Sequence, residues 1–265
     1  MGSGVLGVDF SGAREAGDAL WVTEANHTAT GLVVEDCYRA SDAWGRDRES
    51  AYAGLVGRIT DDDVTTVGLD FPFSLPQVLL SDLCGGDWTG FLEWVAGSDG
   101  PADPAAFSSR CRERAEDLTG ARDVRRETDF QRAALCPYTN RVRSMTYHGA
   151  REVLGRLAPR EDTAVVPMQA DDAATRVCEV YPAATFGWLG CYREGYKNVD
   201  GARERRAHNV RTVEACSVDV GDHRETYLEN HDALDSLAAV VSAARVCDGT
   251  RPDPVGHDAE GHIYI

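Results

Sequence analysis

The chain has 265 residues and a formal net charge of −17 at pH 7, and Lys197 is the single lysine among its 27 basic residues. This length suffices for one large domain or two small ones with a sizeable core. An acidic surface almost without lysine is typical of adaptation to a salt-rich cytoplasm, where the Debye length falls to roughly 3 Å at 1 M salt and screens the repulsion between acids. The net charge therefore does not exclude nucleic-acid binding, and only acids in structurally unusual places indicate a site.

The cysteine pattern and the hydropathy exclude several classes of protein. The eight cysteines form no Cys-x-x-Cys pair and have no zinc-finger spacing. The first residues enter a strand directly, without an apolar leader and without the Ser or Thr of a myristoylation signal. No apolar stretch approaches the length of a membrane span. We therefore expect a cytoplasmic protein with reduced, mostly buried thiols and no membrane partner.

The first third of the chain predicts a small sheet with one helical crossover. Residues 4–10, 18–25 and 30–38 have strand composition, and the short turns between them contain Gly, Asn and Thr, which predicts an antiparallel meander. Residues 47–59 carry apolar side chains at helical spacing and precede a strand at 64–71. A helical crossover returns the chain parallel to an earlier strand, and the right-handed crossover rule places this strand beside the first.

The remainder predicts an insertion followed by a return to the same sheet. Residues 74–160 contain Gly, Asp and Pro clusters and an arginine-dense segment, and we expect an inserted, mainly helical subdomain packed over the strand ends. Residues 176–182 return to the sheet, 201–215 and 231–247 are helices, and the final Gly-His-Ile-Tyr-Ile favours a short edge strand. The expected fold is a single α/β domain over residues 1–265. Its mixed five-stranded sheet has the order 3-2-1-4-5, with strand 2 antiparallel to its neighbours.

Two aspartates occupy unusual places in this scheme. Asp9 and Asp70 each end a short apolar, β-branched run. Aspartate is depleted in strands, and a buried carboxylate without a partner costs several kcal/mol or takes up a proton. Neighbouring parallel strands bring both acids to adjacent carboxyl ends, where open α/β sheets bind their ligands. We expect a cation between them, although Asp9 alone also fits a residue that caps the following turn.

Further acids accompany the first two. Asp232 and Asp235 open the last helix at i, i+3 spacing and so share one face. Asp232 lies in the first turn, where an acid gains about 0.3–1 kcal/mol from the helix dipole, whereas Asp235 lies one turn deeper and is the better metal ligand. Glu179, inside an apolar strand, is either a ligand or the ion-pair partner of Arg176, Lys197 or an arginine of the insertion.

A cluster of arginines locally reverses the sign of this acidic chain. Such a cluster is usually a solvated helix face balanced by nearby acids. It also suits phosphate groups, which a guanidinium grips with two hydrogen bonds. We expect it to bind substrate together with Lys197. Six arginines lie within twenty-two residues, and all but the first belong to the expected phosphate-binding rim: Arg122, Arg125, Arg126, Arg132, Arg141 and Arg143.

The order of the elements resembles the ribonuclease H-like layout. Asp9, Asp70 and His231-Asp232-Ala-Leu-Asp235-Ser-Leu-Ala look like the acidic set of its Holliday-junction-resolvase branch. A family of unknown function described as predicted RNase H-like nucleases is more similar still, nearly end to end. The shared motifs are Gly-Val-Asp-Phe-Ser-Gly, Leu-Asp-Phe-Pro-Phe-Ser-Leu-Pro, Arg126-x-Thr-Asp129, Glu179-Val-Tyr-Pro-Ala-Ala, Tyr196-Lys197 and His-Asp-Ala-Leu-Asp-Ser-Leu. The resemblance implies this fold and an acidic metal site.

Three functions stand as hypotheses. The first is a metal-dependent nuclease in which Asp9, Asp70 and Asp235 hold two Mg²⁺ or Mn²⁺ ions about 3.5–4 Å apart, with Asp232 or Glu179 completing the site and DNA or RNA as substrate. The second is a kinase-like or ATPase-like nucleotide-binding protein, because that superfamily shares the sheet. It normally needs two such domains and a glycine-rich adenosine motif, which we do not find in the sequence. The third is a non-catalytic scaffold with a regulatory cation. The oligomeric state stays open.

Overall fold

One mixed sheet organises the computed structural model, which describes residues 3–249 and 258–265. Among these residues eight strands form the sheet, in the order β5-β6-β4-β1-β2-β3-β7, with β8 beside β6. Strand β2 is antiparallel to both β1 and β3, and every other neighbouring pair is parallel. The strands are β1 (Ser3–Asp9), β2 (Trp21–Thr28), β3 (Gly31–Arg39), β4 (Val64–Leu69), β5 (Thr163–Val166), β6 (Thr175–Val180), β7 (Val218–Asp219) and β8 (Ile263–Tyr264).

The central strands have the neighbours that the sequence predicted, but the sheet has more strands at its edges than predicted. Strand β4 lies parallel beside β1, as the crossover rule predicted. The expected number of five strands is wrong, because β5 and β7 were not foreseen and the tail strand is present as β8. Strand β5 has four residues and β7 and β8 have two each, which is too short to show an alternating pattern. Strand β8 takes the place beside β6 beyond the end of β5.

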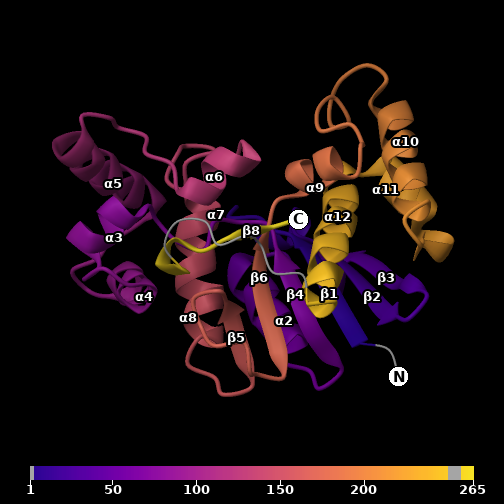
Figure 1. The fold of residues 1–265 in the computed structure, drawn as a ribbon, viewed down its shortest axis with the longest axis horizontal. Coiled ribbons are helices and arrows are strands. Elements are labelled where there is room, and N and C mark those ends of the chain that lie inside the picture. Colours follow the sequence, from indigo (N-terminus) through magenta and orange to yellow (C-terminus); the bar gives the residue numbers. More distant parts are fainter. Residues whose placement is uncertain (1–2, 250–257) are drawn as a thin grey trace.

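Helices cover both faces of the sheet (Figure 1). Alternate side chains of β1 enter different clusters: Leu6 and Val8 pack with Tyr52 of α2, whereas Val5 packs with Leu237 of α12. Helix α12 crosses the front of the sheet in Figure 1, and α2 lies behind it. The helices outside the insertion are η1 (Ala16–Asp18), α1 (Ala40–Ala43), α2 (Arg48–Ile59), α9 (Pro182–Trp188), α10 (Ala202–Glu214), η3 (Gly221–His223), α11 (Arg224–Glu229), α12 (His231–Cys247) and η4 (Asp258–Glu260).

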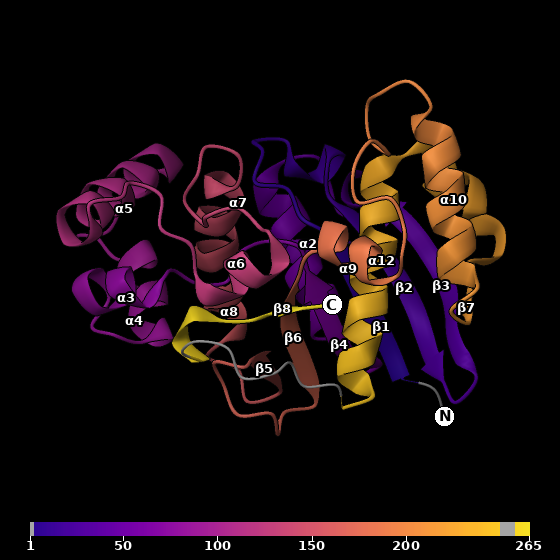
Figure 2. The same cartoon turned by 45° about the horizontal axis from the view of Figure 1, so that its top comes forward.

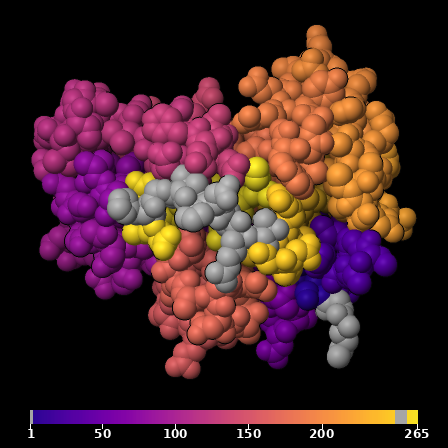
Figure 3. Space-filling view, in the orientation of Figure 1, coloured from indigo at the N-terminus to yellow at the C-terminus, as the bar shows by residue number. Residues whose placement is uncertain are grey.

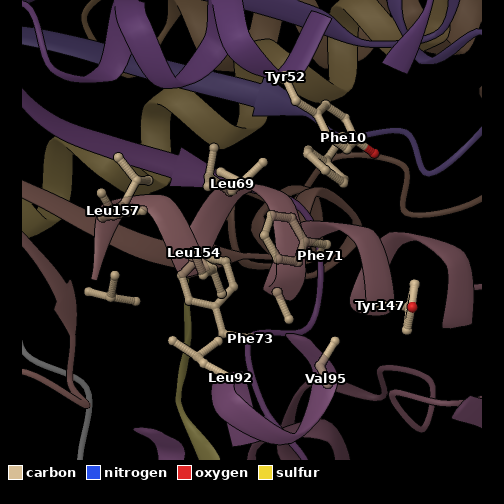
Figure 4. Close-up of a cluster of buried hydrophobic side chains, with 14 of the residues drawn as sticks. Phe10, Tyr52, Leu69, Phe71, Phe73, Leu92, Val95, Tyr147, Leu154 and Leu157 are labelled. Atoms are coloured by element: carbon tan, nitrogen blue, oxygen red, sulfur yellow. The ribbon is translucent and has the colours of Figure 1, made fainter. Parts of the chain in front are cut away.

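The insertion lies to one side of the sheet, away from α10 and α11 (Figure 2). Its buried side chains do not form a separate core. Phe73, Leu92 and Leu154 belong to the same cluster as Phe10 of the sheet side, and Figure 4 shows Phe71 between Phe10 and Phe73, with Leu92 beside Phe73. No helix among the described residues is both long and apolar enough to cross a membrane. The elements within 74–160 are α3 (Gln77–Leu83), α4 (Trp88–Ala96), α5 (Pro104–Thr119), α6 (Glu127–Arg132), α7 (Arg143–His148), the π-helical segment η2 (Gly149–Leu154) and α8 (Gly155–Leu157).

The C-terminal segment fastens the insertion to the sheet. The Glu260 carboxylate accepts the backbone N–H groups of Gln77 (2.5 Å) and Glu127 (3.1 Å), so one acid caps the first turns of α3 and α6. The Ile263 N–H donates to the Thr128 hydroxyl at 2.9 Å, and Ile263 itself lies in β8 against β6. The walls around the strand ends are therefore held by contacts between segments that are far apart in sequence.

Candidate functional site

Asp9 and Asp70 lie at the carboxyl ends of adjacent parallel strands. Asp9 is the last residue of β1, and Asp70 directly follows β4. The Asp70 N–H donates to the carbonyl of Val8 at 3.0 Å, so the ladder between the two strands continues up to the acids. The sheet register thus brings the two carboxylates together, as the sequence predicted.

Two glycines allow α12 to bring a third acid to the same place. A Cβ on Gly7 would lie 2.1 Å from the backbone nitrogen of Val240 and 2.3 Å from the carbonyl oxygen of Ser236, and one on Gly68 would lie 2.8 Å from the carbonyl oxygen of Ala239. The helix backbone therefore rests directly on β1 and β4. Asn230 caps the start of the helix by accepting the N–H groups of Asp232 and Ala233.

Asp235 projects from the second turn of α12 into this group and is 1% exposed. Its two oxygens are both occupied: the Tyr196 hydroxyl donates to Oδ1 at 2.7 Å, and the Lys197 ammonium lies 2.7 Å from Oδ2. In the sequence Tyr196 stands out only as part of the Tyr-Lys motif, because a tyrosine beside a lysine carries no periodic signal. The contact with Asp235 shows that it orients the acid.

The three carboxyl groups destabilise one another's charge. Burial raises the pKa of Asp9, and the charges of Asp235 and Asp70 raise it further. Burial and then Asp235 raise the pKa of Asp70 in the same way. Burial also raises the pKa of Asp235, although Lys197 and Tyr196 work against this. Three acids that repel one another, with Asp235 buried and Asp9 and Asp70 half-buried, are a candidate site for a cation.

Lys197 supplies a positive charge to this group. Burial alone would lower its pKa, but the carboxylates of Asp235, Asp9 and Asp70 outweigh that effect and raise it. The lysine therefore stays an ammonium ion, which excludes it as a neutral nucleophile. Its side chain is 50% exposed, so it can leave Asp235 for solvent or for a bound anion.

Asp9, Asp70 and Lys197 line a cleft of about 280 Å³. The insertion contributes Val142 and Met145 to the lining of this cleft. In Figure 3 the surface is hollowed between the magenta insertion and the orange segment that carries Lys197. The cleft thus combines acids from the sheet with walls from two segments that the sequence places far apart.

Arg126 and Glu179 also line the cleft, but they form a buried ion-pair network instead of a substrate site. Arg126 is fully buried, and its five N–H groups are donated to Asp129, Glu179 and the carbonyl of Glu260. Burial opposes its charge, but Asp129 and Glu179 hold the pKa of Arg126 above its ordinary value. The expectation that Arg126 grips phosphate is therefore corrected, because it has no N–H left to donate. Of the two alternatives for Glu179, the structure gives the ion pair with an arginine of the insertion.

The other predicted residues lie around this centre. Asp232 pairs with His231 (Nδ1 to Oδ1, 2.6 Å), and its side chain is 30% exposed. Its charge still contributes to raising the pKa of Asp9 and Asp235. Asp232 therefore lies beside the three acids Asp9, Asp70 and Asp235, but among the residues that the structure describes it does not line the cleft.

In the part of the chain that the structure describes, the four remaining arginines of the predicted rim lie outside the lining of the cleft. Arg141 is exposed, and Arg143 donates to the side chain of Asn140 at 3.1 Å. Arg125 stacks over the ring of Phe130, and the carbonyl of Arg132 accepts a hydrogen bond from Arg193. Of the five arginines of the predicted rim, Arg126 alone lines the cleft in the described ranges of the chain.

The side chains of the three acids have the ligand atoms that a divalent cation requires. Carboxylate oxygens are the ligands that Mg²⁺ and Mn²⁺ prefer, and Asp9, Asp70 and Asp235 supply them from three elements. No group of three or more His, Cys, Asp or Glu side chains within residues 3–249 and 258–265 is arranged to hold a metal ion. Each oxygen of Asp235 has one partner in this arrangement, the Tyr196 hydroxyl at Oδ1 and the Lys197 ammonium at Oδ2. A cation bound beside Oδ2 would repel the ammonium group, which favours release of Lys197 from Asp235.

Comparison with known proteins gives one match. A family model described as "Protein of unknown function (DUF429)" matches residues 7–260, which include every acid of the site. No curated protein and no solved structure matches the chain. The function must therefore be argued from the site itself.

Proposed function

Since the chain belongs to the DUF429 family, whose description names no function, we propose from its site that it is a divalent-metal-dependent phosphodiesterase acting on nucleic acid. The observation that carries the proposal is the convergence of Asp9, Asp70 and Asp235, which repel one another at the carboxyl ends of β1 and β4. A structural role would place a fixed arginine among them, as Arg126 does for Glu179. Here the neutralising group is a half-exposed lysine.

The strand arrangement supports a ribonuclease H-like relationship. The central strands run β3-β2-β1-β4-β6 with β2 antiparallel, and an acid lies at the end of the first and fourth strands in chain order. In the proposal this corresponds to the order 3-2-1-4-5, and α12, which packs on β1, carries the Asp-x-x-Asp motif that the last helix of the resolvase branch also carries. The relationship rests on topology and on the acids, and it carries no substrate preference between DNA and RNA.

In the proposed reaction the protein's own groups bind, orient and neutralise. Asp9, Asp70 and Asp235 would hold Mg²⁺ or Mn²⁺, and such ions, when bound, activate water and neutralise charge on a phosphodiester. The Tyr196 hydroxyl fixes the rotamer of Asp235 through its bond to Oδ1. Once released from Asp235, Lys197 would contact the phosphate and offset its charge, because its ammonium group lies within reach of the cleft.

Metal affinity and cleavage test the proposal together. Titration calorimetry with Mn²⁺ should show affinity weakened about tenfold or more in Asp9→Asn, and cleavage of a panel of DNA and RNA substrates should be lost with it. Asp62→Asn is the matched control, since Asp62 is an exposed acid in the turn before β4. Equal Mn²⁺ affinity in wild type and Asp9→Asn would reject the ligand assignment.

Replacing the lysine separates its two roles. Lys197→Met removes the ammonium group that competes for Asp235, so Mn²⁺ should bind at least as tightly as in wild type while cleavage falls. Weaker Mn²⁺ binding in this variant would mean that Lys197 supports the cation site instead of competing for it. Metal binding without cleavage of any substrate in the wild type would favour the scaffold function.

A further inference from the structure

Three of the exposed large apolar side chains in the described residues are aromatic, and each lies under an arginine. They are Phe130 (62% exposed), Trp188 (51%) and Tyr192 (47%). The guanidinium carbons lie 3.9–5.6 Å from the ring centroids, which is the geometry of cation–π stacking. Exposed rings are costly in water, and an arginine above a ring still leaves much of the aromatic surface open. The three pairs are Arg125 over Phe130, Arg245 over Trp188 and Arg205 over Tyr192.

These pairs lie on neighbouring segments. An N–H of Arg193 donates to the carbonyl of Arg132 at 3.2 Å, which joins the end of α6 to the loop after α9. The same Arg193 side chain lies against Gly187, where a Cβ would approach its Cδ to 2.6 Å. Figures 1 and 2 both show α6 and α9 facing each other across the top of the sheet.

The surface collects positive charge in a protein of net charge −17. Burial lowers the pKa of Arg245, and the like charge of Arg132 lowers it further, so these two guanidinium groups lie close together. The charge of Asp248 acts in the opposite direction and raises the pKa of Arg245. Guanidinium groups gathered on an otherwise acidic protein suit phosphate groups, which each can bind with two hydrogen bonds.

The surface also borders the acid cleft. Tyr181 lines that cleft, and its pKa is raised by burial and by the charge of Asp70 and lowered by the charges of Arg193 and Lys197. Arg193 is therefore close to the wall that faces Asp70. A ligand bound along the aromatic rings would continue towards the carboxylates.

We propose that Phe130, Trp188 and Tyr192, with the arginines stacked on them and with Arg193, form a binding surface for single-stranded nucleic acid. Every base presents a flat face that stacks on an exposed ring, whereas the bases of a duplex hide their faces against one another. The arginines bind the phosphates between stacked bases. The inference rests on the proposed function only for the cleavage step in the cleft, because binding at the rings needs no metal.

Fluorescence anisotropy with a labelled oligodeoxythymidylate, in EDTA, tests the surface directly. Trp188→Ala and Phe130→Ala should each raise the dissociation constant roughly 5- to 150-fold, which is the range that loss of one stacked base gives. Trp188→Phe should restore most of the affinity, because it keeps a ring under Arg245. Leu118→Ala is the control, since Leu118 is an exposed apolar residue on α5. Thermal unfolding checks that each variant folds.

Salt and strand pairing complete the test. The loss in the aromatic variants should persist at high salt, whereas the effect of Arg193→Ala should shrink as counterions screen phosphate contacts. A blunt duplex of matched length should bind the wild type more weakly than the single strand. Unchanged single-strand affinity in both alanine variants, or tighter binding of the duplex, would overturn the inference. The binding assay contains EDTA and no metal, so a wild-type protein that binds the single strand but cleaves nothing would reject only the proposed phosphodiesterase. A wild-type protein that cleaves, with alanine variants that bind as tightly as it does, would reject only the binding surface.

Discussion

Replacing Arg126 with methionine would remove the centre of the buried network that joins the insertion to the sheet. The guanidinium group donates all five of its N–H groups, and none of its side-chain surface is exposed. Methionine has a similar length and no charge, so Asp129 and Glu179 would remain as buried carboxylates. Each keeps one backbone N–H bond, from residue 126 itself to Asp129 and from Phe73 to Glu179, both at 2.9 Å.

The expected loss of stability is large compared with that of an ordinary surface substitution. Removing one partner from a buried ion pair costs about 3–5 kcal/mol, because an uncompensated charge stays behind. For a chain of this size, with a melting temperature that shifts by roughly 2–4 °C per kcal/mol, the midpoint should fall by roughly 6–20 °C. Arg125→Met is the matched control, since the neighbouring arginine is exposed and its loss should change stability by no more than about 0.5 kcal/mol.

Urea unfolding followed by circular dichroism measures this difference. The double variant Arg126→Met, Glu179→Gln should recover part of the loss, because the amide carries no charge to leave unpaired. The reasoning would be refuted if Arg126→Met unfolded at the same urea concentration as Arg125→Met. It would also fail if the glutamine substitution lowered stability further, since the charge of Glu179 would then not be the cause.

Two further predictions concern packing and pH. Gly7→Ala should destabilise the protein by about 1–3 kcal/mol or more, because its Cβ would lie 2.1 Å from a backbone atom of α12. The shift of α12 would also displace Asp235 and weaken Mn²⁺ binding. In the same urea assay Gly57→Ala should stabilise the protein by roughly 0.5–1 kcal/mol, because its Cβ meets no atom within 4 Å. Burial, Arg132 and Arg126 lower the pKa of His262 from 6.5 to about 4, so the unfolded chain binds a proton that the folded protein excludes. Above pH 6.5 the free energy of unfolding should not depend on His262, and between pH 6.5 and 4 it should fall by up to about 3 kcal/mol relative to that of His262→Phe. If the free energies of unfolding of the two proteins ran parallel over this pH range, the prediction would be contradicted.

The sequence predicted the elements whose periodicity or capping is local. Helix α12 begins and ends where the apolar stripe and the Asp-x-x-Asp motif placed it, and α2 follows its predicted range within one residue. The adjacency of Asp9 and Asp70 follows from a single crossover and was therefore predictable from the sequence. Strand β5 was not predictable in this way, because its four residues are recruited by pairing with β6.

The preference for Asp235 over Asp232 also came from local geometry. One turn of helix separates the two acids, and the deeper one is buried against Tyr196 and Lys197 while the first stays partly exposed beside His231. Neither contact of Asp235 was predictable from spacing. The loop that carries Tyr196 and Lys197 is placed by tertiary packing, with Arg206 donating to the carbonyls of both residues.

The arginine segment shows why counting charge along the sequence misplaced part of the site. Arg126 and Asp129 are at i, i+3, and Glu179 ends a strand, so each residue alone suited a solvated helix or a metal ligand. Only the fold brings the three into a buried place where a guanidinium without its acids would be costly. Two arginines that stay at least partly exposed, Arg125 and Arg245, instead lie over exposed rings. In a chain where acids are abundant everywhere, we therefore base the proposed phosphate- and base-binding surface on the pairing of arginines with exposed aromatic rings and not on the number of arginines.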